Sequence, residues 1–170
     1  MKLVIIINGK GGSGKDTICN IVSKYYKVVN VSSVAPIKEI AKYGGWDGNK
    51  DIKGRKLLSD IKKAFTDYND LPNTYLCYTY AQFLNDANAE ILFVHIREPK
   101  EIKKFKKELI TTFYTLLIKS NKTDYEYGNK SDDNVEKYKY DFVYENNGSK
   151  EKLETDFMNY FEHNIIRKEN

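Results

Sequence analysis

The 170-residue sequence is poor in cysteine, proline and long apolar runs. Its two cysteines, Cys19 and Cys77, lie on separate predicted helices without the spacing of a metal site, which predicts free thiols in a reducing cytosol. No apolar run approaches the roughly 20 residues needed to cross a bilayer. The short apolar run near the N-terminus is not followed by a signal-peptide cleavage site. These absences predict a cytoplasmic protein with no membrane partner.

Arginine is scarce as well, because only three of the 28 basic residues are arginines: Arg55, Arg97 and Arg167. The 28 basic and 24 acidic residues are spread along the chain and leave a net charge of +4. The densest basic cluster, within residues 103–107, surrounds a predicted helix whose Ile102 and Phe105 face inward, which indicates a solvated helix face. A nucleic-acid binder would concentrate its basic residues on one surface, so we expect no nucleic-acid partner.

A glycine-rich loop follows the apolar run Leu3–Ile7 and carries the strongest functional signal. A strand that ends in Gly-x-x-x-x-Gly-Lys lets successive backbone N–H groups wrap a polyphosphate, and the N-terminus of the next helix faces the same charge. Apolar residues at helical spacing after the loop favour this interpretation over a simple glycine-rich turn. Lys15 is predicted to reach the β- and γ-phosphates and to act in catalysis. The predicted phosphate-binding residues are Gly9, Lys10, Gly11, Gly12, Ser13, Gly14, Lys15, Asp16 and Thr17.

The residue after the loop lysine departs from the commonest form of this motif. Asp16 stands where a serine or threonine usually binds Mg²⁺, and the hydroxyl group follows at Thr17. The Gly-Lys-x-Thr order resembles the adenylate kinase family, which implies ATP and Mg²⁺ as cofactors, with Thr17 and Asp16 as metal-binding residues. The form Gly-Lys-Asp-Thr most resembles the deoxynucleoside monophosphate kinases of phages and bacteria. Animal-type phosphomevalonate kinases share Gly-Lys-Asp, so the motif leaves the phosphate acceptor open.

Five apolar segments at wide spacing predict β-strands, with helical patterns between them. Mostly apolar strands are typical of a parallel sheet buried between helical layers. We therefore predict one α/β domain over residues 1–170, a P-loop three-layer sandwich like adenylate kinase with a five-stranded parallel sheet. Loops at the carboxyl ends of its strands would share one cleft. The predicted strands are Leu3–Asn8, Val28–Val31, Ile91–Ile96, Thr115–Ile118 and Phe142–Tyr144.

Helical patterns are clearest in two segments. Apolar residues within 57–68 predict one long helix, and apolar residues within 76–84 predict a second helix that faces the core. Two polar stretches, 44–53 and 120–134, contain few residues able to form a core.

Three further strings resemble the acceptor side of the deoxynucleoside monophosphate kinases: residues 32–39 after the second strand, the helix start at 54–58, and the end of the third strand. The resemblance implies that four residues bind the acceptor, within and beside an insertion at about 33–70, and that Arg97 also acts in catalysis. From the residues alone, Ser33 can equally cap a helix, and Arg55 can be a surface arginine. The four predicted acceptor-binding residues are Ser33, Lys38, Arg55 and Arg97.

The end of the third strand also departs from the family pattern. Related kinases commonly have Asp-x-Arg there, whereas this chain has His95-Ile96-Arg97. The carboxylate that would hold Mg²⁺ is missing, and only Glu98 or Asp16 could replace it. His95 is either a substrate contact or a hydrogen-bonded residue of the sheet.

A lid-like segment at about 119–134 has lysines where the lids of these kinases usually have arginines. Lys119 is predicted to act in catalysis by stabilising the transferred phosphoryl group as a point charge, with Lys122 and Lys130 in the same segment. The loop that follows the last strand resembles the Asn-x-Gly loop beside the adenine ring, which implies Asn147 as a nucleotide contact. Asparagine at 146 and 147 also favours a turn without any ligand.

The leading hypothesis is ATP-dependent phosphoryl transfer, with Mg²⁺, to a nucleoside or deoxynucleoside monophosphate by a monomer or homodimer. One alternative keeps the ATP site and exchanges the acceptor for another small phosphorylated metabolite. The other is a nucleotide-binding protein with little kinase turnover, which the missing aspartate and the arginine-poor lid favour.

Overall fold

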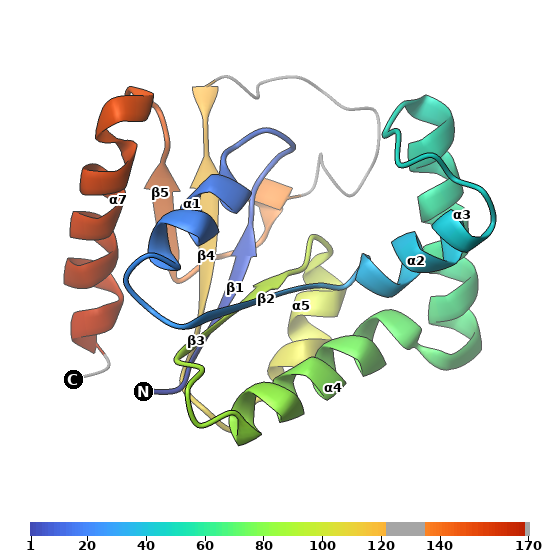
Figure 1. The fold of residues 1–170 in the computed structure, drawn as a ribbon, viewed down its shortest axis with the longest axis horizontal. Helices are drawn as coiled ribbons and strands as arrows, with labels where there is room; N and C mark the ends of the chain where they lie inside the picture. Colours follow the sequence, from blue (N-terminus) through green and yellow to red (C-terminus); the bar gives the residue numbers. More distant parts are fainter. Residues whose placement is uncertain (122–134, 169–170) are drawn as a thin grey trace.

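A five-stranded, all-parallel sheet lies at the centre of the computed structural model, which describes residues 1–121 and 135–168 (Figure 1). The strand order is β2-β3-β1-β4-β5. The predicted α/β fold is confirmed, and each predicted strand is present with ends that differ by at most two residues. The strands are β1 (Leu3–Asn8), β2 (Val28–Ser32), β3 (Ile91–His95), β4 (Phe113–Lys119) and β5 (Phe142–Glu145).

Helices connect the strands and cover both faces of the sheet (Figure 1). Three helices, α2, α4 and α5, have a proline in the first turn. Proline favours a helix start because its fixed φ suits a helix, and because the N–H that it lacks would have no intrahelical partner in the first turn. Within the described residues, no helix combines the length and the apolar character required to span a bilayer. The helices are α1 (Lys15–Val22), α2 (Ala35–Tyr43), α3 (Ile52–Asn69), α4 (Leu71–Asn85), α5 (Pro99–Lys106) and α7 (Lys150–Asn164), with short 3₁₀ helices η2 (Val135–Lys137) and η3 (Ile166–Lys168).

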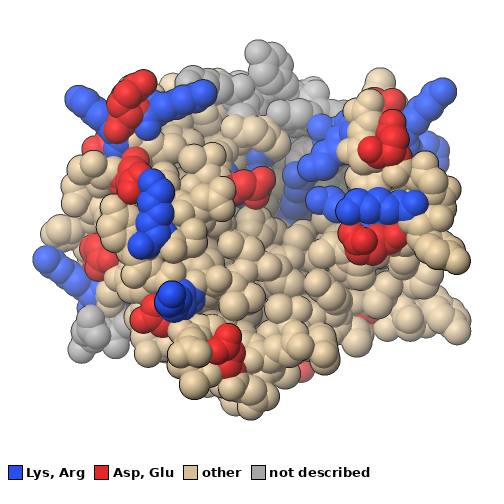
Figure 2. All heavy atoms as spheres, in the orientation of Figure 1, with Lys and Arg blue, Asp and Glu red and all other residues tan. Residues whose placement is uncertain are grey.

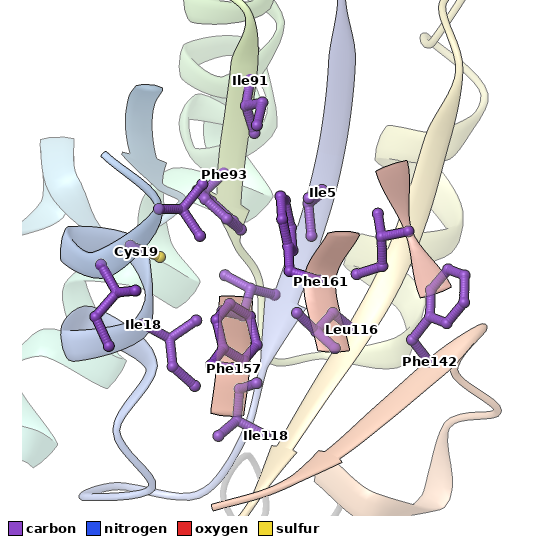
Figure 3. Packing of buried hydrophobic residues seen from close by; sticks show 14 of the residues in the cluster. Ile5, Ile18, Cys19, Ile91, Phe93, Leu116, Ile118, Phe142, Phe157 and Phe161 are labelled. Carbon is purple, nitrogen blue, oxygen red and sulfur yellow. The ribbon is translucent and has the colours of Figure 1, made fainter. Parts of the chain in front are cut away.

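The central strand β1 is buried on both faces, which explains its uninterrupted apolar sequence. Its odd-numbered side chains pack with α1 and α7, and Figure 3 shows this cluster with Cys19 and Phe157 facing the sheet. Val4 and Ile6 point to the opposite face and pack with α4 and α5. Cys19 and Cys77 are free thiols on α1 and α4, as predicted.

Helices α2 and α3 form an arm that extends from the sheet (Figure 1). The long helix predicted from residues 57–68 is present as α3, but its apolar stripe does not enter the core. Of its 18 residues, all of which are described, only Gly54 is buried, and Tyr68 is 83% exposed. The reason is that α3 packs mainly against α2 and α4. In contrast, α4 buries Leu76 and Phe83 as predicted.

Two ion pairs tie the arm to α5. Lys62 on α3 lies 2.7 Å from Glu101, and Asp70 at the α3–α4 junction pairs with Lys104. Both pairs are partly shielded from solvent. The arm therefore has a defined orientation over the carboxyl ends of β2 and β3, where the predicted acceptor residues lie.

Candidate active site

The glycine-rich loop connects β1 to α1 and needs glycine at its two ends. Gly9 has φ +153° and Gly14 has φ +96°, conformations that side chains disfavour. A Cβ on Gly9 would lie 2.4 Å from the carbonyl oxygen of Ile118, and one on Gly14 would lie 2.4 Å from Nδ2 of Asn146. The loop is thus packed closely against Ile118 in β4 and against Asn146, which follows β5.

Lys15 folds back over this loop. Its Nζ donates hydrogen bonds to the carbonyl oxygens of Gly9, at 2.6 Å, and Lys10, at 2.9 Å. The ammonium group therefore lies over the loop, beside the positive end of the α1 dipole. A polyphosphate bound by the loop would meet both charges, so the cradle fits the predicted nucleotide site.

Asn146 directly follows β5 and anchors the loop at the carboxyl edge of the parallel sheet. Its Nδ2 donates to the carbonyl oxygen of Ser13 at 2.9 Å, and its backbone N–H donates to the carbonyl oxygen of Lys119 at 2.7 Å. Asn147 is exposed and accepts a hydrogen bond from the backbone N–H of Asn121. The sequence singled out Asn147, whereas Asn146 is the residue in contact with the loop.

Glu136 lies between two of the predicted phosphate-binding lysines. Its carboxylate is 3.8 Å from Nζ of Lys10 and 3.5 Å from Nζ of Lys119. These contacts bring the end of β4 next to the glycine-rich loop, as the predicted lid would require. Lys122, Lys130 and most of the predicted lid lie outside the described residues.

On the acceptor side, Lys38 is half-buried in a strongly basic environment. Burial lowers the pKa of Lys38 most, and the nearby charges of Lys50, Arg97 and Lys42 lower it further, while Asp16 opposes the shift. Figure 2 shows basic side chains that gather over the arm and in the hollow beside it. The fold therefore brings Lys38 and Arg97 close to the first turn of α1.

Arg55 lies on the arm, at the exposed start of α3. Its Nε donates to the carbonyl oxygen of Lys50 at 2.9 Å. The loop before it packs so closely that a Cβ on Gly54 would lie 2.1 Å from the carbonyl oxygen of Asn49. Arg55 is thus joined through Lys50 to the basic environment of Lys38.

Ser33 is buried, with 3% of its surface exposed, and its backbone N–H donates to the carbonyl oxygen of His95 at 3.2 Å. It does not cap α2, because the helix begins at Ala35 and Val34 is the capping residue. Ser33 instead lines a pocket of about 170 Å³ between the arm and α5. Thr66 of α3 and Asn73 of α4 line the same pocket.

His95 occupies the strand end where the related kinases have aspartate. Its Nε2 lies 3.8 Å from Sγ of Cys19 and 3.5 Å from Oδ1 of Asn30. Burial lowers the pKa of His95 to about 4, so the ring is neutral near neutral pH. The sheet position that the sequence left open thus contains an uncharged, hydrogen-bonded imidazole.

The metal site is correspondingly sparse. Among residues 1–121 and 135–168, no group of three or more His, Cys, Asp or Glu side chains could hold a metal ion. Asp16 and Thr17 are both exposed in the first turn of α1, next to Lys15. Mg²⁺ is commonly held by one or two carboxylates together with substrate phosphates, and these two residues fit that arrangement.

Comparisons with known proteins agree on the fold. No family of known proteins matches the sequence, and no curated protein is similar to it. A sugar kinase from Janibacter sp. HTCC2649 shares 12% sequence identity, with 95% of both chains covered and a TM-score of 0.53. A protein from Chloroflexus aurantiacus j-10-fl, whose name assigns it as a kinase without an established activity, shares 10% sequence identity with this chain. The match covers 96% of this chain and 98% of the other, with a TM-score of 0.57. This chain therefore shares the α/β fold of these two structures.

The structure also reveals candidate site residues that the sequence did not single out. Asn8, at the end of β1, is 1% exposed, and its side chain bonds Gly9, Arg97 and Tyr140. A polar residue at the end of an apolar strand, directly before the loop, was the available signal. No local pattern marked Glu136 or Tyr140.

His95→Gln is expected to make the stability of the fold less sensitive to acid. The folded-state pKa is about 4 and the ordinary value is 6.5, so the stability from neutral His95 is present above pH 6.5 and is lost as pH falls toward 4. Wild type should lose about 2 to 3 kcal/mol more of its free energy of unfolding over this range than the variant. Urea unfolding at several pH values measures the difference, and parallel losses would contradict it.

Proposed function

We propose that this protein transfers the γ-phosphoryl group of ATP, with Mg²⁺, to a nucleoside or deoxynucleoside monophosphate. The observation that carries the proposal is the basic environment of Lys38, opposite the glycine-rich loop. Like charges brought together at a half-buried site destabilise the free protein, and a bound anion would relieve that cost. An uncharged acceptor would not relieve this repulsion, so we expect the acceptor to carry a phosphate group before the reaction.

Each predicted residue has a distinct task in this proposal. Lys15 and the loop amides bind the β- and γ-phosphates and stabilise the charge that develops during transfer. Lys38, Arg97 and Arg55 bind the acceptor phosphate, and Lys119 adds a positive charge near the transferred group. Mg²⁺, held beside Asp16 and Thr17, supplies further charge neutralisation. Phosphoryl transfer requires no protein nucleophile.

The pocket lined by Ser33 favours a nucleotide over a smaller phosphorylated metabolite. Its volume is about 170 Å³, below the roughly 300–1,000 Å³ of sites that enclose a whole drug-sized ligand, so it suits a ring rather than a whole ligand. Pro72 and Leu76 give it apolar walls, while Ser33 and Asn73 provide hydrogen-bonding groups. A flat base with polar edges matches this combination.

The test is ADP release from Mg-ATP with three sets of acceptors: ribo- and deoxynucleoside monophosphates, the corresponding nucleosides with simple sugars, and phosphorylated metabolites without a base. We expect stimulation by at least one monophosphate and none by its nucleoside. Transfer to sugars or nucleosides alone would overturn the proposed acceptor class. Silence across all three sets, with ATP still bound, would favour a nucleotide-binding protein without kinase turnover.

The same assay with Arg97→Ala separates the acceptor site from the ATP site. Losing a guanidinium contact to phosphate should raise the acceptor KM roughly tenfold while the KM for ATP changes little. Arg167→Ala is the matched control, because Arg167 lies in η3 near the end of the described chain. A larger effect on ATP than on the acceptor would reverse the assignment of Arg97.

A further inference from the structure

Asn8 connects the donor loop to the acceptor side through one side chain. Its Oδ1 accepts a hydrogen bond from the backbone N–H of Gly9 at 2.9 Å, and its Nδ2 donates to the carbonyl oxygen of Arg97 at 3.1 Å. The second proton of Nδ2 is donated to the hydroxyl of Tyr140 at 2.8 Å. The buried amide therefore uses both of its donors and its acceptor, which fixes its orientation.

Tyr140 extends this connection to the segment before β5. Its hydroxyl accepts from Asn8 and donates to the carbonyl oxygen of Val135 at 2.8 Å. Burial raises the pKa of Tyr140 above its ordinary value, so the hydroxyl keeps the proton that this second bond requires. The Val135 side chain is fully buried, which leaves this end of the segment little freedom.

The residue after Val135 is Glu136, whose carboxylate lies between Lys10 and Lys119. Through Val135, the hydroxyl of Tyr140 therefore helps to determine where these two lysines lie relative to the loop. One hydrogen-bond network thus joins parts of the molecule that would act on both substrates.

We infer that Asn8 and Tyr140 are positioning residues that hold the donor loop, Arg97 and the Lys10–Glu136–Lys119 cluster in fixed relative positions for phosphoryl transfer. This inference rests on the proposed function. Each substrate alone is bound by groups local to its own side, so loosening the network affects their mutual alignment more than their separate affinities.

Tyr140→Phe tests the inference because it removes only the hydroxyl group. We expect kcat to fall roughly tenfold, since alignment of the reacting groups is sensitive to small displacements. The dissociation constants of ATP and of the acceptor, measured separately by calorimetry, should change less than about twofold. A purely structural residue would instead lower the melting temperature and leave kcat per folded molecule unchanged.

Tyr138→Phe is the matched control. The Tyr138 ring contacts that of Tyr140 edge-on at 5.0 Å, and its hydroxyl lies 3.4 Å from Nζ of Lys106. We expect near-wild-type kcat for this variant. An unchanged kcat in Tyr140→Phe, or an equal loss in both variants, would overturn the inference.

Amide hydrogen exchange in the ligand-free protein keeps this test separate from the proposed function. Tyr140→Phe should speed exchange of the Gly9 amide, whose N–H is bonded to Oδ1 of Asn8, and Tyr138→Phe should not. If wild type transfers phosphate to no acceptor, the proposed function fails, while these exchange rates still report whether the network positions the loop. Unchanged exchange in Tyr140→Phe would overturn the inference by itself.

Discussion

Lys15→Ala is expected to reduce phosphoryl transfer at least about 100-fold, the usual cost of removing one preorganised charge from a transition state. The Nζ of Lys15 lies over the loop, within 2.9 Å of two of its carbonyl oxygens, where the transferred group would gain negative charge. Because the side chain serves a ligand rather than the core, the melting temperature should remain close to that of wild type. Steady-state ADP release and thermal unfolding measure the two effects.

Lys24→Ala controls for the loss of a positive charge. Lys24 follows α1 and pairs with Glu154 on the surface, so its removal should leave turnover unchanged. Turnover retained by Lys15→Ala would contradict the donor-site assignment. Turnover lost together with the folded structure would instead give Lys15 a structural role in the loop.

Gly9→Ala is expected to lower the free energy of unfolding by about 3 kcal/mol and to abolish ATP binding. The new methyl group would meet the carbonyl oxygen of Ile118 at 2.4 Å, which is backbone in β4 and cannot rotate away. The positive φ of Gly9 adds conformational strain. The loop must then move off β4, and its amides lose the arrangement that a phosphate requires.

Gly48→Ala separates strain from collision. Gly48 also has a positive φ, +90°, but nothing lies within 4 Å of a Cβ at this position. Gly48→Ala should therefore lower the free energy of unfolding by only about 1 kcal/mol, which is the strain of the left-handed backbone conformation alone. Chemical denaturation of both variants provides the comparison. Equal losses at the two positions would show that the contact with Ile118 has no energetic weight.

The sheet could be predicted from the sequence because its signals are local. Five apolar runs marked the five strands, and β1 followed by the glycine-rich loop marked the start of a P-loop fold. The apolar stripe of α3 was less informative, since apolar spacing predicts a helix without saying what covers it. Tyr68 is exposed because α3 belongs to the arm, and the spacing of apolar residues along α3 does not predict where the arm lies.

The parts of the candidate site that escaped prediction depend on contacts between distant residues. Asn8 and Tyr140 are separated by 132 positions, and no pattern in the sequence pairs them. Asn146 and Asn147 are neighbours with the same side chain, and only the path of the chain after β5 decides which one reaches Ser13. Ser33 was open to two interpretations because the sequence does not decide whether Ser33 or its neighbour Val34 caps α2.

The arm leaves the sheet after β2 and rejoins the body at α4, which packs on the sheet beside the neighbouring parallel strand β3. Its long helix buries only Gly54, so most of its side chains can diverge without cost to the core. The donor loop has no such freedom, because Ile118 and Asn146 press against its glycines. Under the proposed function, the part of the acceptor site that lies on the arm could change during evolution while the glycine-rich loop stays the same, so related chains could differ in acceptor and share one way of binding ATP.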